Sequence, residues 1–353
     1  MISLVSTIFN DRDGLETFFE AMGSQRRMPD EIVIVDAGSK DGTWELLQAE
    51  AMQSDRPWKM KAIQEIRCNV ARGRNLAIDA ASGDLIISTD IGCDWDIEWL
   101  DELVRPLLLD CSIEQVNGSW AVRREELSSP WALTEWALKG DQKLEATPES
   151  HCSSRSIAYR KNVWEALGRY PEDLTLAGDD AVYDYLSVRA GVKRTGAPKV
   201  RCYWHRHESL NGFFKEAFRY GLGDGEAGIR KKDSLLIGGR ILLEGACLIL
   251  GVVMMMLPWG SFSWTGMLLI AVAALSVAAK VLKMKEGIIR LKEARVDYPM
   301  WRLLIFSYGT KLHWLRGCLK GWARGGSCCA TTRSRLKEMN PLIYRMHLGT
   351  PLH

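Results

Sequence analysis

The chain has 353 residues, of which 47% are hydrophobic and 25% are charged, and its formal net charge is +2. This composition is ordinary for a globular protein, and it excludes a wholly disordered chain. Residues 283–353 carry 14 Lys and Arg against 4 Asp and Glu, a balance of +10, which leaves about −8 for residues 1–282. A basic tail that follows apolar segments favours an anionic membrane surface, and no nucleic acid, as its partner.

Nine cysteines are scattered along the chain without Cys-x-x-Cys spacing, so the sequence predicts neither a zinc site nor a disulfide framework. Free thiols are typical of a reducing cytoplasm. The chain opens directly into the apolar run ISLVSTIF, which lacks the charged start and long apolar core of a cleavable signal peptide.

Short β-branched runs alternate with helical stretches in the N-terminal part of the chain. Strands are expected at 2–9, 31–35, 61–66 and 85–88, and helices at 14–25, 43–52 and 72–81. Strands that alternate with helices of this length predict an α/β fold, with a mainly parallel sheet and helices on both faces. In such a sheet, ligands bind beside the carboxyl ends of the strands.

Polar residues collect where these strands are expected to end. Asn10 follows the first strand, and the segment DAGSKDGT, residues 36–43, follows the second. Asp36 can accept a hydrogen bond from the base or ribose of a nucleotide. Gly38 and Gly42 permit a tight turn whose backbone N–H groups approach phosphate. The alternative is an ordinary surface turn of the same composition.

The stretch ISTDIGCDWDIEWL, residues 87–100, places three aspartates directly after the fourth strand. Carboxylates at the C-terminal end of a buried strand can hold a divalent cation against a phosphate-bearing substrate. Asp90 stands at the strand edge and is the best placed of the three for that role. Asp94 and Asp96 either help to hold the ion or cap the helix that is expected to begin near residue 97.

Together these segments resemble the family 2 glycosyltransferases of the GT-A fold. Four segments occur in the family's order and approximate spacing: IFNDRDGLETFF, VIVDAGSKDGT, ARGRNLAIDAASGDLIISTD and AGDDAVYDYL. The resemblance covers about residues 1–230, and it implies transfer of a sugar from a nucleoside diphosphate sugar with inversion at the anomeric carbon. Residues 153–174 look like the acceptor side of bacterial members from exopolysaccharide and lipid-linked sugar pathways.

The resemblance also implies roles on the donor side. Asp36 matches the Asp that contacts the nucleotide, and Asp90 matches the first acid of the family's D-x-D element, but Gly92 stands where the second acid is expected. Either Asp90 and Asp94 share a Mg²⁺ or Mn²⁺ ion with the diphosphate, or Asp90 binds it together with His205. The expected donor-binding residues are Thr7, Asn10, Asp36, Gly38, Ser39, Arg74 and Asp90.

Sugar transfer needs a base, because an acceptor hydroxyl is a poor nucleophile until its proton is removed. The segment AGDD, residues 177–180, resembles the family's Glu-Asp pair ahead of a helix. This match places Asp179 in the Glu position and Asp180 in that of the catalytic base. The alternative is that Asp179 only caps the helix and Asp180 is an acid of its first turn.

Acceptor contacts are expected on either side of the base. Arg155 belongs to the segment that resembles the acceptor side. EAFRY, residues 216–220, resembles the Q-x-x-R-W element of processive polysaccharide synthases, with Glu216 for Gln and Tyr220 for Trp. These two replacements argue against processivity, and Arg219 and Tyr220 are acceptor-side candidates. The alternative is that the aromatic residues of this stretch form a core face.

Two apolar stretches, 235–257 and 265–282, are each long enough for a helix that crosses a membrane. Arg240 and Glu244 lie four residues apart in the first stretch and can neutralise each other. Basic residues flank the two stretches while the connecting loop has none, so both flanks are expected in the cytoplasm. Residues 300–322 are expected to form an amphipathic helix on the membrane or a short third span. A buried hairpin in a soluble protein is the competing interpretation.

The sequence thus predicts a GT-A catalytic domain over 1–230, a transmembrane hairpin over 235–282 and a basic cytoplasmic tail over 283–353. This arrangement favours an inverting, metal-assisted glycosyltransferase, multi-pass in the cytoplasmic (inner) membrane, with its catalytic domain facing the cytoplasm. Its partners would be a nucleoside diphosphate sugar, a lipid-linked or glycan acceptor, and membrane lipids. Two alternatives stay open: a nucleotidyltransferase, and a catalytically silent nucleotide-sugar-binding subunit of a membrane polysaccharide assembly.

Overall fold

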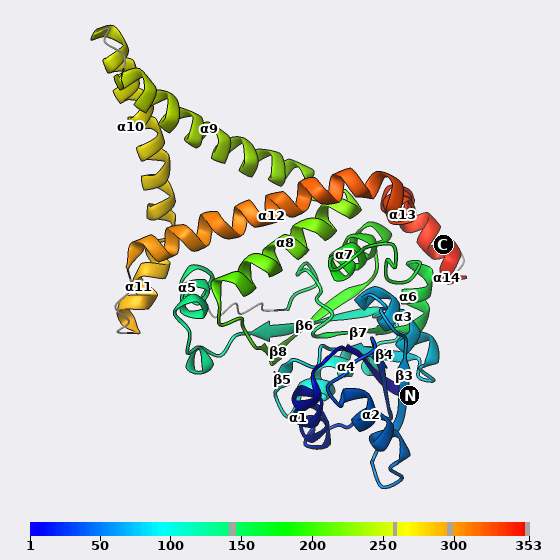
Figure 1. The fold of residues 1–353 in the computed structure, drawn as a ribbon. Coiled ribbons are helices and arrows are strands. Elements are labelled where there is room, and N and C mark those ends of the chain that lie inside the picture. The colour runs from blue at the N-terminus through cyan, green and yellow to red at the C-terminus, as the bar shows by residue number, and fades with distance from the viewer. Residues whose placement is uncertain (141–145, 257–259, 295–298, 350–353) are drawn as a thin grey trace. The chain divides into compact units, whose positions relative to one another are not determined.

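The computed structural model describes residues 1–140, 146–256, 260–294 and 299–349. The chain divides into two compact units, whose elements are labelled in Figure 1. Unit 1 comprises Met1–Arg123, Asp141–Arg206 and Trp322–His353, and unit 2 comprises Arg124–Gly140 and His207–Gly321.

Unit 1 is built on one eight-stranded sheet of order β3-β2-β1-β4-β7-β6-β8-β5 (Figure 1). The pairs β1–β2, β2–β3, β1–β4 and β6–β8 are parallel, while β7 and β5 run antiparallel to their neighbours. The α/β fold is confirmed, with a sheet that is mixed. The strands are β1 Ile2–Ile8, β2 Glu31–Asp36, β3 Lys59–Gln64, β4 Leu85–Ser88, β5 Cys93–Trp95, β6 Gln115–Ala121, β7 Ile157–Arg160 and β8 Arg194–Trp204.

Short polar side chains decide where several helices of unit 1 begin. Asp11 accepts a hydrogen bond from the backbone N–H of Gly14, and Asn69 accepts one from that of Arg72. The helices expected at 14–25 and 72–81 therefore each begin two residues earlier. The helices of unit 1 are α1 Arg12–Gly23, α2 Thr43–Met52, α3 Val70–Ala80, α4 Trp99–Leu109, α6 Lys161–Ala166, α7 Asp179–Ala190, α13 Ala330–Glu338 and α14 Pro341–Leu348.

An aromatic cluster supports the segment that joins β4 to α4. Phe18 of α1 meets Trp95 of β5 edge-on, with ring centroids 5.5 Å apart, and Trp99 of α4 lies 6.1 Å from Trp95. Trp99 also donates a hydrogen bond to the hydroxyl of Ser156 at 2.9 Å. Buried rings with a satisfied N–H hold their surroundings in one arrangement, so the acids between β4 and α4 have a rigid support.

The reversal of β7 brings a further loop to the carboxyl end of β4. Because β7 runs antiparallel to β4, its first residue, Ile157, pairs with the last residue of β4, Ser88. The residues before β7 therefore lie beside those that follow β4. Thr89 confirms this placement, since its hydroxyl donates to the carbonyl oxygen of Arg155 at 2.8 Å.

The C-terminal helices α13 and α14 pack on unit 1. The carboxylate of Asp173 accepts hydrogen bonds from the backbone N–H of Thr332, at 3.1 Å, and from its hydroxyl. Arg345 of α14 forms an ion pair of 2.7 Å with Glu114. Arg189 of α7 donates to two carbonyl oxygens at the end of α13. The last part of the basic tail is thus a packed element of this unit.

Unit 2 is helical, and glycines set its closest helix crossing. A Cβ added at Gly221 of α8 would lie 2.0 Å from the carbonyl oxygen of Trp314, and one at Gly317 of α12 would lie 2.3 Å from that of Phe218. Glycine at these positions lets the two backbones touch. The helices of unit 2 are α5 Pro130–Lys139, α8 Leu210–Ala227, α9 Lys231–Met256, α10 Gly260–Lys283, α11 Lys285–Glu293 and α12 Met300–Cys328, which runs on into unit 1, together with the 3₁₀ turn η1 Arg124–Glu126.

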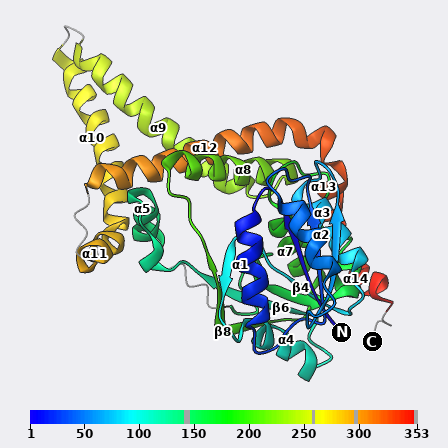
Figure 2. The same ribbon diagram turned by 60° about the horizontal axis from the view of Figure 1, so that its bottom comes forward.

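Helices α9 and α10 pack against each other and extend away from α12 (Figures 1 and 2). In the described part of the chain, α9 and the segment Trp264–Lys283 of α10 are the two helices long and apolar enough to cross a membrane, and most of each is exposed. The stretches expected at 235–257 and 265–282 fall on these helices. Residues 257–259 lie outside the described part of the chain.

A polar network joins α9, α10 and α12. Glu244 of α9 accepts hydrogen bonds from Arg240 at 3.0 Å, from Lys280 of α10 at 2.7 Å and from Tyr308 of α12 at 2.8 Å. Ser276 of α10 donates to the same carboxylate. The ion pair expected from the spacing of Arg240 and Glu244 is confirmed. It belongs to a larger network that connects the two apolar helices to each other and to α12.

Candidate active site

The loops that follow β1 and β2 are joined by hydrogen bonds. The backbone N–H of Asn10 donates to the hydroxyl of Ser39 at 2.8 Å, and the side-chain oxygen of Asn10 accepts from the backbone N–H of Lys40 at 2.9 Å. Beside this loop pair, a Cβ added at Gly73 of α3 would lie 2.8 Å from Cγ2 of Thr7. Gly73 therefore lets the first turn of α3 approach the end of β1 closely.

Asp36 is fully buried, and its carboxylate is occupied by its own loop. It accepts from the backbone N–H of Gly38 at 3.1 Å and of Ser39 at 3.0 Å, and from the hydroxyl of Ser39. The side-chain amide of Gln64 donates to it at 2.9 Å. Asp36 therefore fixes the shape of the loop after β2, and a direct contact with a nucleotide would have to replace one of these bonds.

Arg74 links the acid after β4 to the acid pair at the start of α7. Its guanidinium forms an ion pair with Asp179 and lies 3.4 Å from Asp90. The carbon of the guanidinium lies 5.1 Å from the ring centroid of Tyr170. The side chain is buried, and its Nε atom has no hydrogen-bond partner among the described residues. The expected donor-binding residue Arg74 is thus held between two carboxylates, which compensate its buried charge.

Asp180 is a half-buried acid in the first turn of α7. Burial and the charge of Asp179 raise the pKa of Asp180 to about 6, although two nearby arginines oppose the rise. The residue at the N-cap of α7 is Gly178, so Asp179 does not cap the helix, and the carboxylate of Asp180 accepts a hydrogen bond from the backbone N–H of Ala181 in the first turn at 2.8 Å. A carboxyl group with a pKa near neutrality can accept a proton during a reaction.

Asp90 and Arg155 face each other beside an aromatic side chain of β8. The Nε atom of Arg155 lies 3.7 Å from Oδ2 of Asp90, whose side chain is 42% exposed. The guanidinium carbons of Arg155 and Arg206 each lie 3.7 Å from the ring of Trp204. Stacking of this kind holds an arginine in place while its charge stays available. The expected acceptor-side residue Arg155 thus lies beside the expected donor-side residue Asp90.

Asp94 and His205 lie side by side where β5 pairs with β8. The carboxylate of Asp94 is 2.9 Å from Nε2 of His205 and 3.1 Å from Arg123. The ligand atoms of Asp90, Asp94 and His205 do not all lie within 4.8 Å of one another. The structure therefore brings two of the three expected metal ligands together and places Asp90 apart from them. A carboxylate oxygen beside an imidazole nitrogen is a donor pair that suits a divalent transition metal.

The remaining acid of this segment has a structural role. The carboxylate of Asp96 accepts a hydrogen bond from the backbone N–H of Arg201 at 2.8 Å, and the N-cap residue of α4 is Glu98. The expectation that Asp96 caps the helix is therefore wrong, because the contact with β8 takes its side chain. A Cβ added at Gly92 meets no described atom within 4 Å, so the position of the family's second acid is open.

The expected acceptor residues Arg219 and Tyr220 lie on α8 of unit 2. Tyr220 donates to Glu216 at 3.4 Å and lines a pocket of that unit. Phe213 is buried and packs on Phe306 with ring centroids 5.0 Å apart. The aromatic stretch is thus divided, since Phe213 belongs to the core while Tyr220 borders a pocket.

One acid–histidine pair of unit 1 is not predicted from the sequence. The imidazole of His151 contacts the carboxylate of Asp184, which also accepts from the backbone N–H of Cys152 at 3.1 Å and from Arg194 at 2.8 Å. Asp184 lies one turn after Asp180 on α7. The four-residue spacing of the two acids, which places them on one helix face, is the signal that would have singled out Asp184.

Comparisons with known proteins agree with this fold. Residues 3–168 match the family model described as Glycosyl transferase family 2. No curated protein sequence matches the chain. Among solved structures, the chain is similar to a mannosyltransferase from Pyrobaculum calidifontis in complex with GDP-Man and Mn²⁺, with a TM-score of 0.50 and 17% identity, over 92% of this chain and 87% of that one. It also matches glucosyl-3-phosphoglycerate synthase from Mycobacterium tuberculosis in complex with phosphoglyceric acid, with a TM-score of 0.44 and 17% identity, over 64% of this chain and 77% of that one.

The family match covers the part of unit 1 that holds the loops after β1, β2 and β4. Asn10, Asp36, Arg74 and Asp90 lie within the matched segment, and Arg74 connects it to the acids of α7 beyond it. The mannosyltransferase structure supports the fold alone. Residues 3–168 therefore match glycosyl transferase family 2, and the chain has the GT-A fold.

Proposed function

We propose that the protein is an inverting glycosyltransferase that moves a sugar from a nucleoside diphosphate sugar to a lipid-linked or glycan acceptor at the cytoplasmic face of the inner membrane. The observation that carries the proposal is the grouping of Asp90, Arg74, Asp179 and Asp180 at one place in unit 1. Such a site combines a base for the acceptor with charged groups beside a diphosphate.

Asp180 is the proposed base. Because its pKa is raised to about 6, the carboxylate is mostly ionised at neutral pH and is basic enough to take a proton. Asp179 is held by Arg74 and serves to position that arginine. The acceptor oxygen attacks the anomeric carbon as the bond to the diphosphate breaks on the opposite face, and the acceptor proton passes to Asp180. A single displacement of this kind inverts the configuration.

The donor is proposed to bind along the loops after β1, β2 and β4. Asn10 and Ser39 join two of these loops, and Asp36 with Gly38 gives the second loop its shape. Arg155, held by Trp204, supplies positive charge near the departing diphosphate, which stabilises the charge that develops there.

Asp94 and His205 are the proposed protein ligands of a divalent cation. They offer one oxygen and one nitrogen, and His205 is exposed. A nitrogen ligand favours Mn²⁺ over Mg²⁺, which takes oxygen ligands, and the similar mannosyltransferase structure contains Mn²⁺. With two protein ligands the ion would depend on donor oxygens for most of its coordination. When bound, it would neutralise charge on the leaving diphosphate.

Membrane association is proposed for α9 and α10, which are apolar, exposed and long enough to span a bilayer. The basic residues that flank the pair favour a cytoplasmic position for both ends. Anchoring would keep the active site near an acceptor that is confined to the bilayer, which raises its effective concentration. Arg219 and Tyr220 of α8 are the proposed acceptor contacts of unit 2.

The test uses the purified full chain in detergent with a membrane lipid extract as the source of acceptor. UDP-, GDP- and dTDP-sugars are supplied with and without Mn²⁺, and release of nucleoside diphosphate is measured. We expect release with at least one donor, stimulation by Mn²⁺, and a product whose anomeric configuration, read by NMR, is opposite to that of the donor. Pyrophosphate release would instead identify a nucleotidyltransferase, and no turnover with any donor would favour a silent binding subunit.

A further inference from the structure

Unit 2 contains a basic pocket where α9 and α10 approach α12. Its volume is about 420 Å³, within the range of sites for small ligands. Helices α5, α9, α10, α11 and α12 all contribute side chains to its walls. Its cationic side chains are Lys139, Arg240, Lys280, Lys283, Arg290 and Lys311.

Carboxylates compensate only part of this charge. The ion pairs are Arg240 and Lys280 with Glu244, Lys139 with Glu135, and Arg290 with Glu286. Among the described residues, no carboxylate lies within ion-pair distance of Lys283 or Lys311. Six cations against three carboxylates leave a surplus of three positive charges around one cavity, which attracts an anion.

Lys311 of α12 shows the effect of this surplus. Burial, followed by the charges of Lys280 and Arg240, lowers the pKa of Lys311 below its usual range. Its ammonium group lies 3.5 Å from the hydroxyl of Ser307. A bound anion would relieve the repulsion among these cations and stabilise the charged form of Lys311.

The same pocket has an apolar side. Ile237 and Ile241 of α9 and Phe306 of α12 line it. Beyond it, exposed apolar side chains continue along both helices, as Leu242 on α9 is 74% exposed and Leu282 on α10 is 72% exposed. A ligand that joins an anionic head to an apolar chain would match both features.

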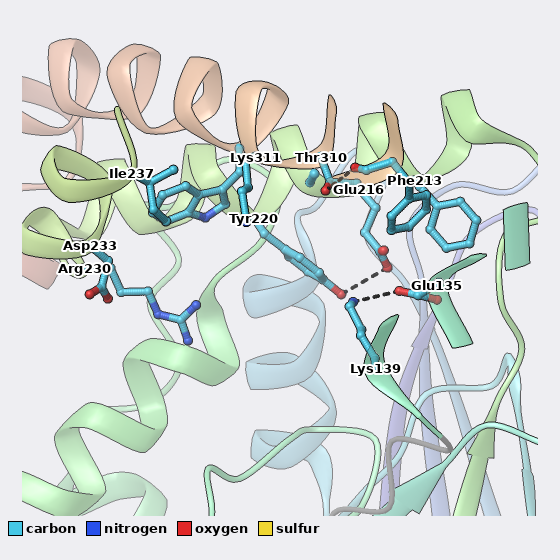
Figure 3. A pocket seen from close by; sticks show the side chains of 13 residues that line it. Glu135, Lys139, Phe213, Glu216, Tyr220, Arg230, Asp233, Ile237, Thr310 and Lys311 are labelled. Carbon is cyan, nitrogen blue, oxygen red and sulfur yellow. Dashed lines mark hydrogen bonds and ion pairs between the residues drawn. The ribbon is translucent and has the colours of Figure 1, made fainter. Parts of the chain in front are cut away.

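A neighbouring pocket of unit 2 lacks the charge surplus (Figure 3). It shares Lys139 and Lys311 with the basic pocket, and Arg230 is its third cation. Its lining acids are Glu135, Glu216 and Asp233. The lining of this pocket thus holds equal numbers of cations and acids, three of each, and Figure 3 shows Lys139 turned towards Glu135. The surplus is confined to the side that α10 and α11 line.

We propose that the basic pocket binds the phosphate headgroup of an anionic phospholipid from the membrane that holds α9 and α10. Lys283 and Lys311 donate to the phosphate, and an acyl chain lies along the exposed apolar side chains of the two helices. Basic pockets between helices at the cytoplasmic end of a membrane span suit such headgroups. The proposal rests on the membrane association proposed above and is independent of the transfer reaction.

Native mass spectrometry of the full chain in detergent tests the proposal without measuring turnover. Phosphatidylglycerol is titrated, with phosphatidylcholine as the neutral reference and inorganic phosphate as the headgroup without a chain. We expect the double variant Lys283→Gln, Lys311→Gln to raise the half-saturating concentration of phosphatidylglycerol about tenfold. The matched control is Lys231→Gln, Lys232→Gln, which removes two exposed lysines at the start of α9 outside the pocket. This control is expected to change the half-saturating concentration of phosphatidylglycerol less than about threefold.

Three results would overturn the proposal. Equally weakened binding of phosphatidylglycerol in the two double variants would show a general attraction to charge. Equal binding of phosphatidylcholine and phosphatidylglycerol would show that the pocket does not distinguish the headgroups. Displacement of phosphatidylglycerol by inorganic phosphate at millimolar concentration would assign the pocket to free phosphate. Circular dichroism checks folding, and if Lys311→Gln unfolds, Lys283→Gln is compared with Lys231→Gln, with about a threefold difference expected.

Discussion

The Nε2 atom of His205 lies 2.9 Å from Oδ2 of Asp94, although the two residues are 111 positions apart in the sequence. Strand pairing creates this contact, because Asp94 stands opposite Tyr203 where β5 runs antiparallel to β8. The result is an oxygen–nitrogen donor pair, with His205 exposed and Asp94 half-buried, at the edge of the sheet where the parallel strands end.

Removing either member of this pair should weaken binding of Mn²⁺. We expect Asp94→Asn or His205→Ala to raise the Kd for Mn²⁺, measured by calorimetry in the presence of a nucleoside diphosphate, at least about tenfold. Asp110→Asn, an exposed acid at the end of α4, is the control and should leave the Kd unchanged. If Asp90→Asn alone abolished Mn²⁺ binding while both substitutions at the pair had no effect, the ligand assignment would be wrong.

The proposed base makes a kinetic prediction. Asp180→Asn should lower kcat by about 10²- to 10⁴-fold with little change in the KM for the donor, because it removes proton acceptance and leaves the donor loops intact. In the wild type, kcat should rise with pH up to about 6 and then level off, since the carboxylate must be ionised to act. Unchanged transfer in the variant, or a rate that does not depend on pH between 5 and 7, would contradict this role.

The ionised carboxylate of Asp180 should lower the stability of the folded chain at high pH. Its pKa is 3.8 as a reference and about 6 in the folded chain, so the stability that its neutral form contributes is complete below 3.8 and lost as the pH rises through about 6. We expect Asp180→Asn to be more stable than the wild type at pH 8, by about 1 kcal/mol after allowing for its partial exposure. Thermal unfolding at several pH values measures this difference, which should shrink towards pH 4.

Local sequence patterns were sufficient for four of the eight strands, β1 to β4, which carry the loops of the donor side. The expected strand at 85–88 and helix at 43–52 have the bounds of β4 and α2. Both are continuous periodic runs between turn signals, and such runs fold in the same way in many tertiary surroundings. The polar residues after β1, β2 and β4 could therefore be placed on one edge of the sheet from the sequence.

Partners of the site residues could not be predicted in the same way, because tertiary contacts choose them. Arg74 of α3 meets Asp179 of α7, which lies 105 positions away in the sequence. Asp96 has the sequence context of a helix cap, yet β8 takes its carboxylate. The family resemblance assigns Arg155 to the acceptor side, and only the reversed direction of β7 brings it to Asp90.

Loss of Arg74 should lower the free energy of unfolding and shift the pH dependence of kcat. Arg74→Gln leaves Asp90 and Asp179 without their shared cation, and we expect a loss of about 3 kcal/mol in the free energy of unfolding. Because Arg74 lowers the pKa of Asp180, its loss should also move the rise of kcat to higher pH. Arg72→Gln, whose ion pairs are exposed, is the control and should change stability by less than about 0.5 kcal/mol. Equal losses in the two variants would contradict the bridging role.

The glycine crossing of α8 and α12 should tolerate no side chain. A Cβ at Gly317 would lie 2.3 Å from the carbonyl oxygen of Phe218, and backbone atoms cannot move aside as a flexible side chain would. We expect Gly317→Val to force the helices apart and to cost about 1–3 kcal/mol or more, measured by thermal unfolding in detergent. Gly245→Ala on α9 is the control, because a Cβ there meets no described atom within 4 Å. It should leave stability unchanged or raise it slightly, since alanine favours helix. A Gly317→Val chain as stable as this control would show that the two helices do not depend on backbone contact.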